Sequence, residues 1–590
     1  MKRFLKISLF VVAALGVLAY FWVVLPVWGI PFNGRRHGAP PLTPAWALEC
    51  WLWEDDENTA ARVDELLNGY KSHDIPVRTV IIDSLWSMRY NDYEVDTVRY
   101  PHPRRWFRAL QNSGYRVVLW TTSMVNSYNK DTRIKESHDW YEMARDSGYL
   151  CGNGYQFKWW KGKGGFIDYT NPAAMRWWHG LQQQVYDLGI DGWKLDGTAT
   201  NFSSRAGPLL LFYQKCHQGI LTTRQYMDHY YRDEYRYGLT RNPEFVTLSR
   251  AMDRLYHPEG FAPVDASPVN WVGDQEHYWE SDEQLDEKYK GKDKDLAFGG
   301  VQGFESAIRS ILRSARRGYN IVGSDVAGFS GRVIPPRLYI RWAQFSTFCG
   351  LFLNGGHGER ALWKRTPQEL EIIREYAWLH TELVPYMYHY VVTAHHDGQR
   401  LMKPVKGKYH YLFGEALLVA PIYRDRPERE VHLPRGRWRY WFADDTLLQG
   451  PRIVTREYPL DEYPLYVREG AIIPVRVSRS YTGLGDTSSA GYLTFLIWPE
   501  EEHRFEVFRE HDSSTTLQYT KQKGTLKISL EGKKTPHILR IHLPEKPEHV
   551  LLDGAELDGN REWHYDREKK KLIIRTSRYR TGEYLISLAK

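Results

Sequence analysis

Short apolar runs alternate with stretches of helical periodicity from Pro44 to about residue 390. This alternation is typical of a parallel sheet built from βα units. Eight of the runs are predicted to be strands, the number that closes a TIM barrel. The predicted strands are residues 46–53, 77–83, 115–121, 189–196, 244–250, 269–274, 319–325 and 349–354. We therefore predict an α/β fold with a (β/α)8 barrel over residues 44–390.

Two long segments, residues 122–167 and 197–243, follow the third and fourth predicted strands. In such barrels the loops after the strands build the active site. We therefore expect both segments to frame a functional site.

The pattern changes from about residue 391. Short alternating runs, separated by Gly, Pro and Asp, continue to the C-terminus and are typical of all-β domains. We predict a proximal β-sandwich at 391–475 and a distal β-sandwich at 476–590.

The N-terminus carries a long uncharged run. Residues 7–30 hold no charged side chain, and about 20 apolar residues suffice to cross a bilayer. A cleaved signal peptide usually has a shorter apolar region of about 7 to 15 residues and a small-residue cleavage site, whereas bulky residues follow Ala19 here. We therefore favour an uncleaved transmembrane signal anchor at 1–30 and a linker at 31–43.

The charges around this run set the predicted topology. Basic residues precede it, which favours a cytoplasmic N-terminus, although Arg35 and Arg36 just beyond it weaken the contrast. The expected protein is single-pass, with its catalytic part outside the cytoplasm, in a periplasm, a lumen or the extracellular space.

Composition narrows the function classes. The net charge of +7 is spread along the chain without a long basic run, which argues against a nucleic-acid partner. The 23 Trp and 40 Tyr suit sugar rings as well as protein cores. The four cysteines form no CxxC pair, so we predict no metal site and no cofactor, and leave one or two isolated disulfides open. The oligomeric state is open too.

Charged residues end several predicted strands: Asp83, Asp196, Arg250, Asp274 and Asp325. Strand ends share one mouth in a barrel, where burying unpaired charges costs several kcal/mol. A structural ring of ion pairs is one explanation. The other is catalysis, and carboxylates without a metal-ligand cluster favour glycoside hydrolysis, in which one attacks and the other protonates the leaving oxygen.

Blocks throughout residues 44–475 resemble glycoside hydrolase family 31, which includes α-glucosidases, α-xylosidases, α-galactosidases and sulfoquinovosidases. They occur in family order. The blocks are GFIDYTNPAAMRWW (165–178), GIDGWKLD (189–196), LSRAM (248–252), WVGDQEHYW (271–279), IVGSDVAGF (321–329), LYIRWAQF (338–345), PYMYHY (385–390), GEALLVAPI (414–422), LPRGRWRYWF (433–442) and PLYVREGAIIP (464–474).

The resemblance implies a retaining mechanism with Asp196 as nucleophile and Asp274 as acid/base, their carboxyl groups about 5 to 5.5 Å apart. Asp196 must then stay ionised, and Lys194 or Arg250 would lower its pKa. Asp274 must start protonated, which an apolar setting near Trp271 would favour.

The resemblance also implies sugar-binding roles for Asp83, Arg250 and His357. Lys194 lies two residues before the nucleophile, on the same side of the strand, where it can hold the carboxylate or touch the sugar.

Several further residues are expected around the sugar. Trp271 is expected to contact it, and Trp120 and Trp160 are predicted either to wall the pocket or to pack in the core. Asp325 is predicted to support the site from behind by pairing with Arg341.

The chain departs from the family in two places. Members generally have a β-sandwich before the barrel, whereas about a dozen residues separate the apolar run from the first predicted strand here. After the nucleophile, the segment GTAT (197–200) stands where many members carry a glutamate. Lys194 is similar to the branch with α-xylosidases, but neither feature identifies the sugar.

The leading hypothesis is a membrane-anchored retaining exo-α-glycosidase that acts on a carbohydrate substrate. A catalytically silent carbohydrate-binding protein and a transglycosylase that uses the same site are the alternatives.

Overall fold

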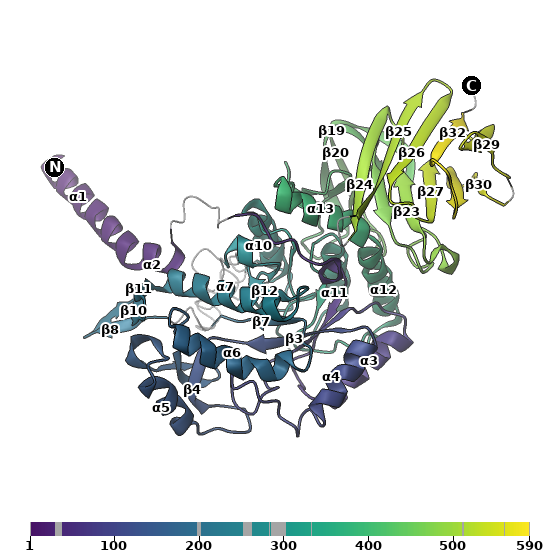
Figure 1. Ribbon diagram of the computed structural model, residues 1–590. Coiled ribbons are helices and arrows are strands. Elements are labelled where there is room, and N and C mark those ends of the chain that lie inside the picture. The colour runs from purple at the N-terminus through teal and green to yellow at the C-terminus, as the bar shows by residue number, and fades with distance from the viewer. Residues whose placement is uncertain are drawn as a thin grey trace.

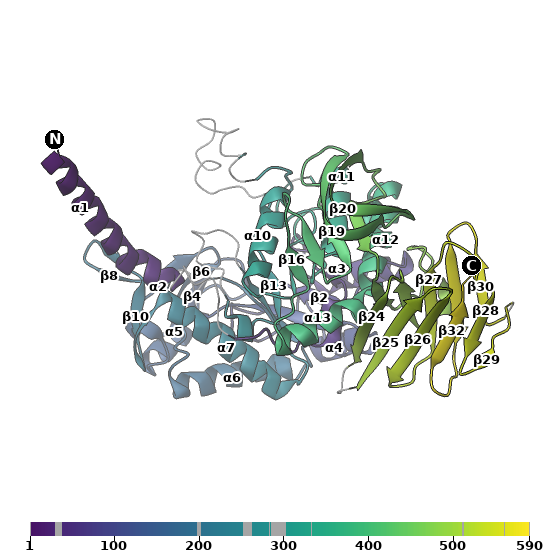
Figure 2. The same ribbon diagram turned by 90° about the horizontal axis from the view of Figure 1, so that it is seen from above.

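A barrel forms the centre of the protein, with β-sheets on one side and helix α1 projecting from the other (Figures 1 and 2). The computed structural model describes residues 2–29, 38–197, 202–251, 262–281, 284, 303–331, 333–509, 513–559 and 561–588.

The predicted barrel is confirmed, and each predicted run contains one parallel strand. The strands are β1 (Trp51–Leu52), β2 (Thr79–Ile82), β3 (Arg116–Thr121), β7 (Gly192–Leu195), β12 (Val246–Arg250), β13 (Val269–Trp271), β14 (Val322–Gly323) and β15 (Leu353–Asn354). They lie in the order β14-β13-β12-β7-β3-β2-β1-β15. A parallel bridge between Asp325 and Leu353 joins the two ends of this order, so the barrel is nearly closed.

The first predicted strand is shorter than expected. Residues Ala45–Leu48 form a 3-10 helix instead, and only Trp51–Leu52 pair with neighbouring strands. Pro44 precedes this turn in an extended conformation, and its ring fixes the backbone angle there.

Helices surround the barrel and follow its strands: α3 (Ala60–Ser72), α4 (Pro103–Asn112), α6 (Pro172–Tyr186), α7 (Thr223–Arg241), α10 (Phe304–Arg316), α11 (Pro336–Thr347), α12 (Pro367–Glu382) and α13 (Val384–His396). Several begin with proline, which is already set for a helical backbone and has no N–H to leave unpaired. Thr222 and Thr366 cap α7 and α12 through reciprocal capping boxes.

Both long segments carry their own secondary structure. The first holds β4 (Met124–Asn129), α5 (His138–Asp146), a 3-10 turn (Cys151–Asn153), β5 (Phe157–Trp159) and β6 (Gly162–Phe166), and its strands form the sheet β4-β6-β5. The second holds two hairpins, β8 (Ser204–Ala206) with β9 (Leu209–Leu211) and β10 (Tyr213–Cys216) with β11 (Gly219–Thr222). Short 3-10 turns elsewhere are Val264–Ala266, Leu362–Lys364 and Thr487–Ser489.

The C-terminal part is all-β, as predicted. One sheet has the order β16 (Met402–Pro404), β17 (Tyr411–Phe413), β18 (Leu417–Val419), β21 (Leu465–Arg468), β19 (Glu428–Tyr440), β20 (Ala443–Glu457). A second has β22 (Ile472–Val475), β23 (Leu493–Ile497), β27 (His537–His542), β31 (Lys571–Thr576), β30 (Trp563–Asp566). The third has β24 (Glu502–Arg509), β25 (Ser513–Gln522), β26 (Thr525–Gly532), β32 (Glu583–Ser587), β28 (His549–Leu552), β29 (Ala555–Glu556). Because β22 pairs with β23, residues 472–475 join the second sheet, and the exact domain boundaries stay a prediction.

Arg341 joins the barrel to the first of these sheets. It is buried on α11 and donates to the backbone carbonyls of Tyr458, Pro459 and Glu462 at 2.6 to 2.9 Å. The predicted pairing of Arg341 with Asp325 is therefore wrong, because Arg341 neutralises carbonyl dipoles of a loop outside the barrel mouth.

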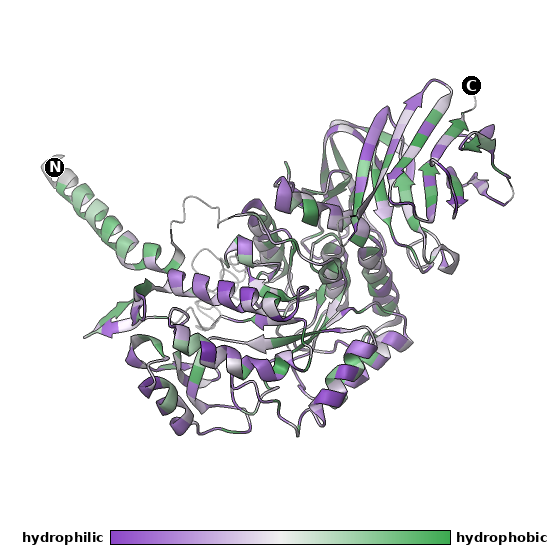
Figure 3. Cartoon of the chain, in the orientation of Figure 1, coloured by the Kyte–Doolittle hydropathy of each residue, from purple (hydrophilic) through white to green (hydrophobic). Residues whose placement is uncertain are grey.

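The N-terminal helix is apolar and exposed. Helix α1 (Lys2–Ala19), a π-helical turn (Tyr20–Val24) and α2 (Leu25–Trp28) contain a candidate membrane span at Ile7–Val27. Its apolar window is not buried inside the protein, whereas Pro26 and Val27 at its end are buried. Figure 3 shows the hydrophobic colour along this helix. Length and composition alone make it a candidate, as they would for a signal sequence.

Candidate active site

Strand register brings the predicted site residues together. Lys194 on β7 pairs with Trp120 on β3 and with Leu248 on β12. Residues paired in a parallel sheet point to the same face, as do residues two apart on one strand. Asp196 and Arg250, each two residues beyond a member of this row, therefore meet at the mouth.

Asp196 is held by three donors. Trp120 Nε1 donates to its Oδ2 at 2.9 Å, the backbone N–H of Gly197 to its Oδ1 at 2.7 Å, and Arg250 lies 3.3 Å from Oδ1. Burial alone would raise the pKa of Asp196, but the charges of Arg250 and Lys194 and these hydrogen bonds outweigh burial and lower it. Asp196 thus stays ionised, as a nucleophile requires. The rest of the GTAT segment lies outside the described residues.

Asp274 lies beyond the end of β13, and Arg250 lies between its carboxylate and that of Asp196. One guanidinium nitrogen of Arg250 lies 2.6 Å from Asp274 and 3.3 Å from Asp196. The side chain of Asp274 is 44% exposed, so its setting is polar and open rather than the apolar one we expected. The open side leaves room for a leaving group and for water.

Trp271 lies beneath these charges. It is only 1% exposed, and its ring lies 4.9 Å from the guanidinium of Arg250 and 5.8 Å from the ammonium of Lys194. This burial does not fit the sugar contact that we expected. Trp271 instead supports Arg250 through a cation–π contact.

A buried ion pair forms the floor of the site. Lys194 Nζ lies 2.7 Å from Asp83 Oδ2 and 3.6 Å from the ring centroid of Trp53. Burial would lower the pKa of Lys194, but Asp83, Asp325 and Asp196 outweigh it and raise the pKa, so the lysine stays charged.

Asp325 supports this floor from behind. It accepts a 2.9 Å hydrogen bond from Trp53 Nε1. Burial, and to a lesser extent the charge of Asp274, raise the pKa of Asp325 to about 7, against the opposing effect of Lys194. Asp325 therefore supports the site through Trp53 and Lys194.

His357 faces two aspartates that the sequence analysis missed. Its Nδ1 lies 2.6 Å from Asp56 Oδ1, and its Nε2 lies 3.3 Å from Asp55 Oδ2. Burial and the neighbouring Asp83 raise the pKa of Asp55 to about 7, although Lys194, His357 and Lys161 act against them. Asp55 lies three residues beyond β1, whereas Asp83 directly follows β2, so the strand-end rule selected Asp83 and missed Asp55.

Trp120 and Trp160 play different parts. Trp120 is buried and orients Asp196. Trp160 is 44% exposed and packs edge-on against Trp159, which contacts Tyr90, which in turn contacts Trp120. This row of aromatic rings extends from Asp196 to the surface. Trp160, at its exposed end, is a candidate for stacking against a sugar ring.

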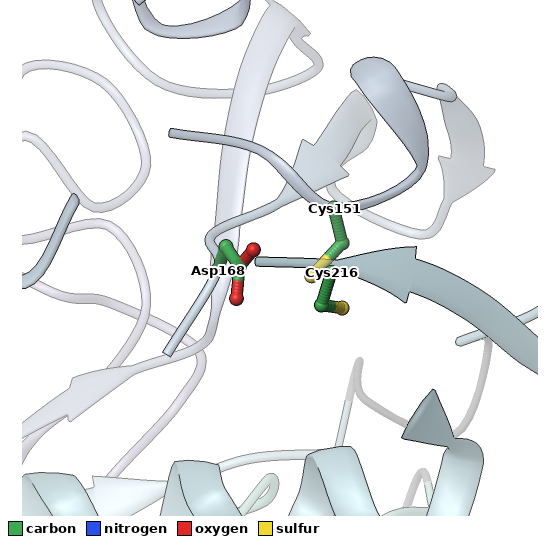
Figure 4. A group of neighbouring side chains, drawn as sticks. All are labelled: Cys151, Asp168 and Cys216. Atoms are coloured by element: carbon green, nitrogen blue, oxygen red, sulfur yellow. The ribbon is translucent and has the colours of Figure 1, made fainter. Parts of the chain in front are cut away.

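A separate cluster has the composition of a metal site. Cys151, Asp168 and Cys216 are buried, and their potential ligand atoms lie within 4.8 Å of one another (Figure 4). Asp168 already accepts hydrogen bonds from Thr170 and from the backbone N–H of His217. These contacts tie the β10–β11 hairpin to the residues that directly follow the first long segment. All four cysteines, including Cys151 and Cys216, are free thiols.

Comparison with known proteins matches the chain to a family. The chain matches the glycosyl hydrolases family 31 TIM-barrel domain over residues 40–285 and 298–390, and the family's C-terminal domain over residues 385–473. An α-xylosidase from Emericella nidulans is 26% identical over 465 residues, 74% of this chain and 54% of the relative. An isomaltosyltransferase from Sporosarcina globispora is 23% identical over 91% of this chain and 52% of the relative. The chain thus spans about half the length of these relatives.

Solved structures share the fold. A family 31 dextranase from Flavobacterium johnsoniae has a TM-score of 0.78 at 20% identity and covers 93% of this chain and 71% of its own. A cycloalternan-forming enzyme from Listeria monocytogenes has a TM-score of 0.78 at 19% identity and covers 93% of this chain and 55% of its own.

The hydrogen bond from Trp120 to Asp196 generates the first prediction. Trp120→Phe keeps an aromatic ring but removes a donor to a charged group, which is worth about 1.5–3 kcal/mol. We expect kcat/KM on a cleaved α-glycoside to fall roughly 10- to 100-fold. Trp106→Phe, which removes a similar bond to Asp64 on the outer helices, is the matched control. Equal activity of the two variants would contradict the role of Trp120.

Because burial raises the pKa of Asp55, we predict that replacing Asp55 with asparagine stabilises the folded chain at high pH but not at low pH. In the folded chain this pKa is about 7, above the unfolded value, so the stabilising contribution is complete below about pH 4 and is lost as the pH rises through 7. Asp55→Asn has no such loss. We expect its Tm to exceed that of the wild type at pH 8, by a few degrees, and not at pH 4.

Thermal unfolding across this pH range checks the expectation for Asp55. Asp131→Asn, which removes a partly exposed carboxylate that contacts Lys161, serves as the control for loss of a carboxylate. A gain for Asp55→Asn that is the same at both pH values would refute the assignment.

Proposed function

Because the chain belongs to glycosyl hydrolase family 31, we propose that it is a retaining exo-α-glycosidase, anchored in a membrane by helix α1, which cleaves an α-linked sugar outside the cytoplasm. The observation that carries this proposal is the contact of one Arg250 nitrogen with both Asp196 and Asp274. It brings two carboxylates to one point at the barrel mouth, as double displacement requires.

The first step forms a covalent intermediate. A carboxylate oxygen of Asp196 attacks the anomeric carbon while the bond to the leaving oxygen breaks, and Asp274 gives its proton to that oxygen. Trp120 and Gly197 hold the attacking group in place before the sugar arrives. Such preorganisation avoids reorienting the carboxylate during the reaction.

The second step releases the sugar. Asp274, now ionised, takes a proton from water as the water oxygen attacks the anomeric carbon and the bond to Asp196 breaks. Each step inverts the anomeric carbon, so the product keeps the α configuration. The exposure of Asp274 supports this role, because water must reach it.

The floor of the site supports exo action. The pair of Lys194 and Asp83 is buried over Trp53, with each side chain 7% exposed. A terminal sugar can place its hydroxyls on such charges, whereas a continuing chain would have to displace a buried ion pair at high cost. Asp55 and His357 line the same region and are expected to bind further hydroxyls.

Transglycosylation is the second candidate. Relatives of this chain are named isomaltosyltransferase and 1,6-alpha-glucosyltransferase, and a structural neighbour is a cycloalternan-forming enzyme. The same intermediate serves both reactions, since only the acceptor differs. Product analysis with added acceptor sugars separates them.

The stereochemical outcome tests the proposal. The full chain, in detergent, is offered aryl α-gluco-, α-galacto-, α-xylo- and sulfoquinovosides, and proton NMR follows the first-formed sugar. We expect the α anomer first, and at least a 1000-fold lower rate for Asp196→Ala. If the β anomer were the first product formed, the double-displacement mechanism would be contradicted.

Asp274→Ala separates an enzyme from a silent binding protein. An aryl leaving group of low pKa needs little help from an acid, so this variant should lose far less bond cleavage on it than on an alkyl glycoside. Equal turnover by the wild type, Asp196→Ala and Asp274→Ala would show that neither aspartate is catalytic.

A further inference from the structure

Large apolar side chains are exposed on the hairpins of the second long segment. Leu209 and Leu210 follow the turn between β8 and β9 and are 48% and 41% exposed, and Ile220 on the β10–β11 hairpin is 67% exposed. Single exposed apolar residues are ordinary, but neighbouring ones on projecting hairpins mark an interaction surface. We call Leu209, Leu210 and Ile220 the hairpin patch.

The hairpin patch lies beside the apolar helix. Trp22 Nε1 donates a 2.9 Å hydrogen bond to the carbonyl of Leu210. Helix α1 and the β8–β9 hairpin project from the same side of the barrel in both views (Figures 1 and 2). The patch therefore continues the surface of the candidate membrane span.

The position of Trp22 gives the depth of this contact. It lies five residues before Val27, where the candidate span ends. At about 1.5 Å per residue, this is ~8 Å along the helix axis. Interfacial protein segments bury their apolar face about 5–10 Å into the boundary of headgroups and acyl chains. Leu210 would thus reach that boundary if α1 crosses the bilayer.

Basic side chains on the hairpins would be attracted to a bilayer surface that carries anionic lipids. Arg205 and Lys215 are exposed on β8 and β10, close to the apolar tips. Basic residues close to a surface of anionic lipids are attracted to it over about a Debye length. The combination of apolar tips and basic flanks is that of an interfacial contact.

Hydrogen bonds hold the hairpins in place. Asp168 accepts from the backbone N–H of His217 in the turn of the β10–β11 hairpin, and the hydroxyl of Thr223 after β11 donates to the carbonyl of Phe202 before β8. The capping box of Thr222 starts α7 directly after β11. Both hairpins are therefore fixed to the barrel, and Leu209, Leu210 and Ile220 stay exposed on them.

The same support leads to the catalytic residues. Tyr230, eight residues beyond Thr222 on α7, donates to the backbone carbonyl of Asp196. Eight residues of helix measure ~12 Å. A membrane contact at the hairpins would therefore hold the mouth of the barrel near the lipid surface.

We propose that the hairpin patch inserts into the bilayer beside helix α1, as a second membrane contact, and turns the active site toward α-glycosides displayed on lipids of the same membrane. This inference rests on the membrane anchorage and the glycosidase activity under the proposed function. Its tests separate failure of the patch from failure of either.

Depth measurement tests the contact. The full chain is placed in nanodiscs with about one third anionic lipid, and an environment-sensitive fluorophore is attached to a cysteine introduced by Leu210→Cys, Phe10→Cys or Ile453→Cys. Phe10 lies in the candidate span, and Ile453 is exposed on β20 of the C-terminal sheet. We expect spin-labelled lipid to quench the labels at 210 and 10, with 210 quenched best by a shallow spin label, and not the label at 453.

The outcomes of the depth measurement are distinct. Quenching at 10 with none at 210 overturns the patch and leaves the anchor standing. No quenching at 10 overturns the anchor and the patch together.

Activity on two substrates tests the consequence. The variant Leu209→Ser/Leu210→Ser/Ile220→Ser is compared with the wild type in nanodiscs, on a soluble aryl α-glycoside and on the same sugar attached to a lipid. We expect kcat/KM to fall about 10-fold on the lipid-linked sugar only. An equal fall on both, or none on either, overturns the orientation of the site, whereas an inactive wild type overturns the glycosidase function itself.

Discussion

One guanidinium group holds the proposed catalytic centre together. Arg250 contacts Asp196 and Asp274 and rests on the buried ring of Trp271, so a single cation on a fixed platform sets the relative position of two carboxylates from different strands. Breaking a buried charge pair by removing one partner costs about 3–5 kcal/mol. The architecture around Arg250 therefore has to keep it in place, and the register of β7, β12 and β13 does so.

Burial and the placement of the cations set the protonation states of the carboxyl groups. Among the described residues at the mouth, Asp196 lies near Arg250 and Lys194 and has a lowered pKa, whereas Asp55 and Asp325, which are buried with more acidic neighbours, have pKa values raised to about 7. Burial raises the pKa of Asp55 and of Asp325 although cations act on both carboxyl groups. The site thus keeps Asp196 ionised, as the proposed attack requires, and lets Asp55 and Asp325 approach neutrality near physiological pH. Of these two, Asp55 is the one expected to exchange hydrogen bonds with sugar hydroxyls.

The alternation of short apolar runs with stretches of helical periodicity predicted the barrel, because its strands are short and buried and several end at charged residues. The strand-end rule also found Asp83, Asp196, Arg250 and Asp274, because parallel strands bring their ends to one mouth. The strand-end rule could not show that Trp271 is buried, that Trp120 donates to Asp196, or that Arg341 donates to a distant loop. Contacts between side chains that are far apart in the sequence produce no periodic pattern in it. Asp55 was missed because the first predicted strand ended two residues earlier.

Trapping the covalent intermediate tests the central claim most directly. In Asp274→Ala, a glycosyl fluoride needs no acid for its departure, but water then lacks its base, so the glycosyl-enzyme should accumulate. Mass spectrometry of digested protein, after incubation with α-gluco-, α-galacto- and α-xylosyl fluorides, is expected to find one sugar attached to Asp196. Attachment to another residue, or fluoride release with no attached sugar at any stage, would contradict the assignment of Asp196 as the nucleophile.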